Sequence, residues 1–159
     1  MMAKNGLIDK IDIPIVNIHR IRGENDPRDE AIRYQEEIVK FVQKRNGLPA
    51  FDLVILGLGE DGHVASIFPG NIELFYSEKI CDVTHHPITN QKRVTITGTV
   101  INNATSVVFL VTGKNKATIV AEVLGKKADY TRFPVSLVKT ANGNTEWFLD
   151  YDAASLLEK

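Results

Sequence analysis

The sequence predicts an α/β domain in which a mostly parallel sheet carries helices on both faces. The apolar run at residues 51–56 has the length and the branched side chains of a strand buried on both faces of a parallel sheet, and another strand is expected at 106–111. Segments with helical periodicity alternate with such runs, which is the pattern of α/β folds. Because the chain has 159 residues and 43% of them are hydrophobic, we expect residues 1–159 to form a single domain.

The N-terminal part is predicted to contain a short helix, a short strand and a long helix. Residues 7–13 have the pattern of a helix end before Pro14, and residues 17–21 that of a strand. The long helix begins after Asp26, a residue type that caps helices, and extends to about residue 44. Its core-facing stripe is predicted to consist of Ala31, Ile32, Ile38, Phe41 and Val42.

The rest of the chain alternates strands, loops and helices. A loop at 46–49 ends the long helix, and the strand at 51–56 follows it. Further strands are expected at 79–84, 93–97, 106–111 and 146–149. A helix at 115–124 is closed by Gly125, and a terminal helix begins at Tyr151.

Composition excludes several classes of function. The formal net charge is -1, so no basic surface points to nucleic acid as a partner. The single cysteine, Cys81, excludes an intrachain disulfide and is typical of a reducing compartment. No signal peptide and no run of about 18 apolar residues is evident. We therefore expect a cytoplasmic protein with no membrane partner.

The segment GLGEDGHVASIFPG, residues 57–70, places one histidine in a glycine-rich turn. It follows a buried strand, at the edge of the sheet where α/β folds bind ligands. A G-x-G-x-x-G pattern is formed by Gly57, Gly59 and Gly62, so a dinucleotide-binding module is one alternative. That pattern needs a long helix directly after the loop, whereas Pro69 stops any helix within about two turns. Asp61 would also repel a diphosphate.

The same segment resembles the G-x-G-x-D-G-H-x-A-S-[LI]-F-P-G signature of the 6-phosphogluconolactonases. This family belongs to a superfamily shared with the glucosamine-6-phosphate deaminases, and the resemblance implies its Rossmann-like, NagB-like fold. The resemblance continues in NIHRIRGE (17–24), in RVTITGTVINNATSVVFLVTGKNKA (93–117) and in NTEWFLDYDAASLL (144–157). The motifs that resemble this family therefore extend over nearly the whole chain.

The resemblance implies hydrolysis of 6-phosphogluconolactone to 6-phosphogluconate, a step of the pentose phosphate pathway. His63 matches the histidine that acts as general base on water, and Asp61 is expected to orient it. Gly57 and Gly59 shape the backbone beside the substrate. Arg93 and Lys116 match the phosphate ligands of the superfamily. No metal and no cofactor is implied.

Two further alternatives concern the activity itself. The deaminases carry a glutamate where this chain has Phe68, and Phe68 cannot transfer a proton, so the lactonase is favoured over a deaminase-like enzyme. Family members are longer at the front, where they carry a phosphate loop that is missing here. We therefore expect an N-terminally truncated domain, the C-terminal part of a longer sugar-phosphate lactonase. A non-catalytic or impaired sugar-phosphate-binding fragment stays open, as do a homodimer and a complementing N-terminal segment as partners.

Overall fold

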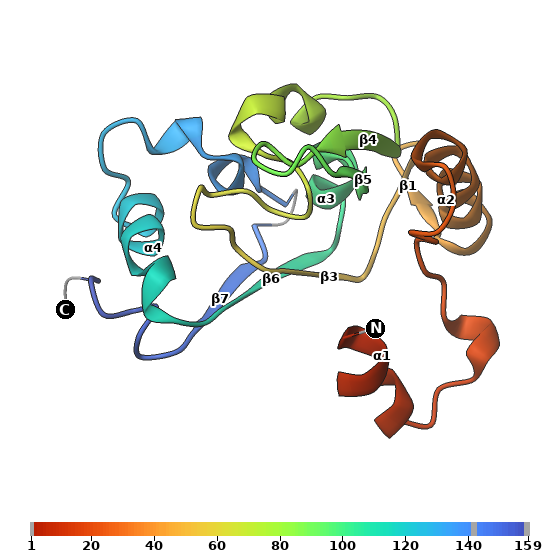
Figure 1. Cartoon of the computed structure of the whole chain (residues 1–159), viewed down its shortest axis with the longest axis horizontal. Coiled ribbons are helices and arrows are strands. Elements are labelled where there is room, and N and C mark those ends of the chain that lie inside the picture. The colour runs from red at the N-terminus through yellow and green to blue at the C-terminus, as the bar shows by residue number, and fades with distance from the viewer. Residues whose placement is uncertain (1, 141–142, 158–159) are drawn as a thin grey trace.

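The computed structural model describes residues 2–140 and 143–157. Its α-helices are α1 (Met2–Gly6), α2 (Pro27–Phe41), α3 (Gly98–Asn102) and α4 (Ala117–Leu124). Its strands are β1 (Lys44–Arg45), β2 (Leu48–Pro49), β3 (Leu53–Leu56), β4 (Cys81–His85), β5 (Lys92–Ile96), β6 (Ser106–Val111) and β7 (Thr145–Leu149). Short 3-10 helices lie at η1 (Ile8–Lys10), η2 (Ile15–Asn17), η3 (Pro69–Phe75), η4 (Lys114–Lys116), η5 (Tyr130–Arg132) and η6 (Pro134–Leu137). Figure 1 shows their arrangement.

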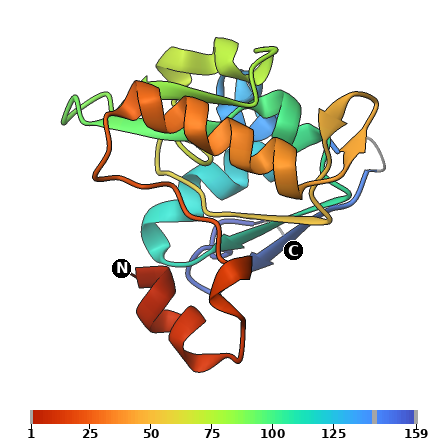
Figure 2. The ribbon, with the colours of Figure 1, turned by 90° about the vertical axis from the view of Figure 1, so that its right-hand side faces the viewer.

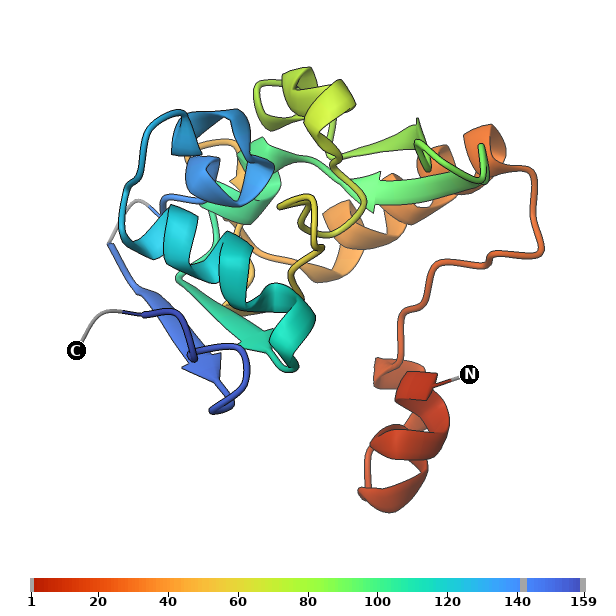
Figure 3. The ribbon, with the colours of Figure 1, turned by 60° about the vertical axis from the view of Figure 1, so that its left-hand side comes forward.

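A three-stranded parallel sheet with the order β3-β6-β7 forms the centre of the fold. Helix α4 lies along one face of this sheet, as Figure 3 shows. Phe109 of β6 is buried there and stacks on Trp147 of β7, with 4.2 Å between the ring centroids. Complete burial of such a side chain contributes about 1.5–3 kcal/mol. The predicted α/β class and its parallel sheet are confirmed.

The opposite face of this sheet is exposed, so burial alternates along the strands. Residues 53–56 of β3 read exposed, buried, exposed, buried. The apolar side chains on the exposed face are between 49% and 58% accessible and belong to Leu53, Ile55, Leu110 and Phe148. The sequence predicted that the strand at 51–56 is buried on both faces, and this is wrong for the residues that the structure describes.

Strands β4 and β5 form an antiparallel hairpin outside the parallel sheet. Helix α2 lies across this hairpin, as Figure 2 shows, and their contact buries Ala31, Ile38 and Cys81. The two strands occur within one or two residues of their expected positions, but their pairing is antiparallel. Adjacent strands joined by a short turn pair in this way because no crossover is needed to bring them together.

Helix α2 begins as predicted: the Asp26 carboxylate accepts a hydrogen bond from the backbone N–H of Arg28, at 2.9 Å. It ends at Phe41 and not near residue 44, because Asn46 and Gly47 adopt positive φ angles and pair β1 with β2. The predicted core stripe is only partly correct. Ala31 and Ile38 are buried as expected, whereas Ile32 and Phe41 are exposed. Ala31 and Ile38 are seven positions apart and lie on one narrow stripe of the helix, which contacts the hairpin. Ile32 and Phe41 lie outside this stripe.

Two predicted elements do not form. Residues 17–21 make no β-ladder with any described residue, because side chains of α2 hold this segment instead. In the terminal segment, the described residues 151–157 form successive turns and no helix. There the Asp150 carboxylate accepts hydrogen bonds from the N–H groups of Gly113 and Ala153, which fixes the turn after β7.

The N-terminal arm, which contains α1, extends away from the body (Figures 1 and 3). Several of its apolar side chains are exposed, namely Leu7, Ile11, Ile15 and Val16. Within the described residues, no helix has both the length and the apolar character needed to cross a membrane.

Candidate functional site

The loop after β3 folds into tight turns, and no helix follows it directly. Gly62 donates a hydrogen bond to the carbonyl of Gly59, at 3.1 Å, and its φ of +79° suits a residue without a Cβ. A second turn follows at Ala65, with a bridge between Val64 and Ile67. No helix forms between His63 and Phe68, and Pro69 begins η3. The dinucleotide pattern therefore lacks its helix.

His63 and Asp61 are in direct contact. The Nδ1 atom of His63 lies 2.6 Å from the Oδ1 atom of Asp61. The same oxygen accepts the backbone N–H of His63, at 3.2 Å. Because a carboxylate only accepts hydrogen bonds, the Nδ1 atom must carry the proton, and in the neutral ring the Nε2 atom keeps its lone pair. The predicted orienting role of Asp61 has a geometric basis in this contact.

Gly59 leaves the space that the histidine ring occupies. A Cβ atom at this position would lie 2.1 Å from the Nδ1 atom of His63 and 2.5 Å from the Oδ1 atom of Asp61. The ring and residue 59 are also tied through the backbone, since the N–H of Gly59 donates to the carbonyl of His63 at 2.9 Å. The structure thus gives Gly59 a packing role beside the histidine. Gly57 has open space around its Cβ direction.

Phe68 connects the histidine with Arg93. This side chain is buried, and its ring centroid lies 4.6 Å from that of His63 and 5.2 Å from that of His86. The guanidinium carbon of Arg93 lies 6.0 Å from the same centroid. Phe68 therefore brings two of the predicted site residues, far apart in sequence, to one place. The sequence had assigned Phe68 only the exclusion of a deaminase.

A cavity of about 280 Å³ opens beside Arg93. Ser66 lines it, and the backbone N–H of Ser66 donates to the Thr95 hydroxyl, which ties the loop to β5. Arg22 lines the same cavity. Sequence reasoning missed this arginine because 71 positions separate it from Arg93 and no local pattern relates the two.

Lys116, in η4, lies close to the first part of the loop after β3. Its Nζ atom is 4.0 Å from the Oε1 atom of Glu60, which also accepts a hydrogen bond from the Asn115 amide at 2.5 Å. Glu60 precedes Asp61 directly, so Lys116 is near the histidine loop. In the described part of the chain no polar contact joins Lys116 to Arg93, and Arg93 lies on the hairpin and not at the end of a strand in the parallel sheet.

The last property of the site concerns metal ligands. Among the described residues, no three histidine, cysteine, aspartate or glutamate side chains gather in a way that could hold one. His85 and His86 are neighbours in the sequence, but the Nδ1 atom of His86 accepts the backbone N–H groups of Ile88 and Thr89.

Residues 1–147 match the sequence model of the family described as glucosamine-6-phosphate isomerases/6-phosphogluconolactonase. The chain belongs to this family. It is 42% identical over 151 residues to the 6-phosphogluconolactonase of Haemophilus influenzae, a match that covers 95% of this chain and 63% of that protein. It is 35% identical to the human 6-phosphogluconolactonase over 98% of this chain and 60% of that protein.

Solved structures of the glucosamine-6-phosphate isomerase/6-phosphogluconolactonase family have the same fold. A crystal structure described as devB protein matches with a TM-score of 0.89 and 39% identity, over 96% of this chain and 64% of that one. The 6-phosphogluconolactonase of Trypanosoma brucei matches with a TM-score of 0.76 and 29% identity, over 99% of this chain and 66% of that one. The chain thus spans between 60% and 66% of the length of these four proteins.

Proposed function

We propose that this chain carries the catalytic histidine of a 6-phosphogluconolactonase, with His63 as the base that activates water. The observation that carries the proposal is the contact between His63 and Asp61, which leaves the Nε2 atom free to accept a proton. The family and the names of its relatives supply the substrate class, a phosphorylated sugar lactone.

The contact between His63 and Asp61 supports the following reaction. The Nε2 atom takes a proton from water as the water oxygen bonds to the lactone carbonyl carbon. The resulting tetrahedral intermediate expels the ring oxygen, which receives the proton back from the imidazolium and becomes a hydroxyl group. Asp61 stabilises the imidazolium through its short contact with the Nδ1 atom. The products of this sequence are a carboxylic acid and an alcohol within one molecule, 6-phosphogluconate.

We assign the phosphate of the substrate to Arg93 and Lys116. Arg93 offers a planar fork and Lys116 a compact charge, and the two therefore suit a dianion from different directions. Gly57, whose Cβ direction is open, leaves room for the lactone at the start of the loop. The buried Phe68 offers no group that transfers a proton, which favours ester hydrolysis over amine release.

The test is hydrolysis of the lactone, with the spontaneous rate subtracted. We expect His63→Ala to lower kcat by about 10²–10⁴-fold. His85→Ala is the matched control, because His85 is exposed on the hairpin, and it should retain full activity. Equal rates for wild type and His63→Ala would overturn the proposal, as would release of ammonia from glucosamine-6-phosphate.

We further propose that the exposed sheet face binds the remainder of a family-length domain. Ile55 and Phe148 are examples of its uncovered apolar side chains, and a monomer rarely leaves such a face open. This chain matches 63% of the Haemophilus protein, and we propose that the part of that protein outside the match is what binds this face. An added α/β segment would bury the face and could pair with the edge of β3.

Coexpression tests this docking. The tagged chain should copurify with the part of the Haemophilus lactonase that lies outside the 151 matched residues. A double variant with Ile55→Lys and Phe148→Lys should lose the partner, whereas Ile88→Lys, on the exposed tip between β4 and β5, should keep it. A homodimer that the same double variant dissociates would assign the face to a second copy.

A cytoplasmic location is also part of the proposal. The single cysteine, Cys81, is buried and unpaired, as in proteins of reducing compartments. Fractionation of cells that express the native gene would test it, and recovery in the membrane or secreted fraction would count against it.

A further inference from the structure

The carboxylate of Glu30 is almost completely buried on the inner side of helix α2, with an exposed fraction of 1%. Its Oε1 atom accepts hydrogen bonds from the backbone N–H of Arg22 at 2.7 Å and from Arg33 at 2.6 Å. Its Oε2 atom accepts from the amide of Asn25 at 2.8 Å and again from Arg33 at 2.9 Å. Burial of a charge is costly unless every partner is in place. The buried carboxylate therefore has a structural role between helix α2 and the segment that precedes it.

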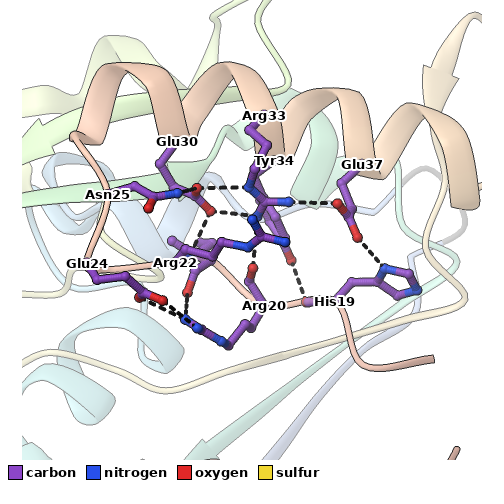
Figure 4. Close-up of polar contacts among 10 residues, drawn as sticks. His19, Arg20, Arg22, Glu24, Asn25, Glu30, Arg33, Tyr34 and Glu37 are labelled. Atoms are coloured by element: carbon purple, nitrogen blue, oxygen red, sulfur yellow. Dashed lines mark hydrogen bonds and ion pairs between the residues drawn. The ribbon is translucent and has the colours of Figure 1, made fainter. Parts of the chain in front are cut away.

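Glu30 holds the segment 19–25 against helix α2, as Figure 4 shows. Arg33 lies between Glu30 and Glu37, donates hydrogen bonds to both, and also donates one to the backbone carbonyl of Arg20, at 3.0 Å. Tyr34 approaches the carbonyl of His19, at 3.4 Å. Contacts from side chains thus replace the β-ladder that this segment lacks.

Arg22 differs from the other two arginines of this network, because its guanidinium is not paired with a carboxylate among the described residues. Arg33 is paired with Glu30 and Glu37, and Arg20 is paired with Glu24. Arg22 is fixed through its backbone, and within residues 2–140 and 143–157 its side chain makes no recorded hydrogen bond or ion pair. Its charge is therefore available for a ligand.

Arg22 lines two cavities, one beside Glu24 and Glu37 and one beside Arg93. The cations of the first cavity, Arg20 and Arg33, are already paired with carboxylates, so the cavity beside Arg93 is the one that offers charge to an anion. Arg22, Lys92 and Arg93 all line it, together with Ser66 of the histidine loop. Glu30 also reaches the lining, but both of its oxygens are occupied by the donors named above. A cavity with several cations and one fully paired carboxylate favours an anion.

We propose that Arg22 is an anion-binding residue of this site, which contributes a second guanidinium to the oxyanion group that Arg93 binds. The ligand class is a phosphate monoester, or free phosphate, and the assignment to a sugar phosphate rests on the proposed function. Glu30 is a positioning residue: it sets the place of the Arg22 backbone and does not touch the ligand.

Titration of the intact chain with inorganic phosphate and with 6-phosphogluconate tests the inference, using calorimetry and the side-chain N–H signals of arginine in NMR spectra. Arg22→Ala should raise the Kd for both by about tenfold, since one charge-assisted contact is lost. Arg28→Ala, an exposed arginine at the start of α2, should leave both values unchanged. Glu30→Gln should weaken phosphate binding in the folded protein, and if hydrolysis is observed it should raise KM more than it lowers kcat.

An unchanged Kd in Arg22→Ala would overturn the inference, as would equal losses in Arg22→Ala and Arg28→Ala. Absence of saturable phosphate binding to the wild type would also overturn it. None of these titrations requires hydrolysis, so they are independent of the lactonase assay. Binding that depends on 6-phosphogluconate alone, with no response to phosphate, would contradict the assigned oxyanion.

Discussion

The substitution Gly59→Ala offers a direct test of how the loop positions His63. The new Cβ atom would lie 2.1 Å from the Nδ1 atom, whereas ordinary contacts begin at 3.4 Å, so the ring must move by about 1.3 Å. The Oδ1 atom of Asp61 lies 2.5 Å from the same Cβ position and must move as well. The φ angle of Gly59 is not in the left-handed region, so the effect is steric.

A displacement of this size should abolish the contact between His63 and Asp61. Misplacement of a catalytic group by about 1 Å costs on the order of 10²-fold in rate, and we expect a loss of that size in kcat for the lactone. Nitrogen-15 NMR spectra of the imidazole should lose the signature of the Nδ1–H hydrogen bond even in a preparation that does not turn over substrate. Gly70→Ala is the matched control, because a Cβ atom there meets nothing within 4 Å.

The refuting result is equally specific. If Gly59→Ala keeps the imidazole spectrum and kcat of the wild type, the ring does not occupy the space beside residue 59. If Gly70→Ala loses as much activity as Gly59→Ala, the loss reflects the loop as a whole. Thermal unfolding of both variants separates a local displacement from a loss of folding.

Two further predictions concern the hairpin layer. The pKa of Glu30 is lowered from 4.5 to about 2, mainly by hydrogen bonds from Arg33, so its stabilising contribution is complete above about pH 4.5 and is lost as the pH falls toward 2. Glu30→Gln should lower the free energy of unfolding by about 2–3 kcal/mol at pH 7, and the difference from wild type should shrink in denaturant titrations between pH 4.5 and 2. Glu24→Gln, at an exposed pair, should show no resolvable change, and a constant difference between Glu30→Gln and wild type down to pH 2 would contradict the reasoning. Burial raises the pKa of the Cys81 thiol to about 12, so iodoacetamide at pH 8 should modify it only after unfolding; rapid modification of the native protein, followed by mass spectrometry, would be incompatible with the packing under α2.

Local chemistry was sufficient for several features. Asp26 caps α2 because a capping side chain bonds to a backbone N–H two residues away, and residues 106–111 form β6 at the expected bounds. Asp61 and His63 meet because they are two positions apart in one turn, with only Gly62 between them. Each of these interactions is decided within a few residues, so a single sequence contains the necessary information.

Other features depend on which segments meet in space. Residues 17–21 have a strand pattern, but a strand forms only beside a partner, and side chains of α2 hold this segment in place of a ladder. The exposed face of β3 reads in sequence like a buried one, because an apolar residue does not reveal whether a covering layer is present.

The sequence by itself determined the α/β class, the position of the glycine-rich histidine loop and the family signature within it. Only the tertiary structure decided that Phe68 brings Arg93 to His63, and that Arg22 shares a cavity with Arg93. The physical reason is the range of the interactions. Turns and caps are set by neighbours along the chain, whereas the charge around a ligand is gathered from segments that only packing brings together.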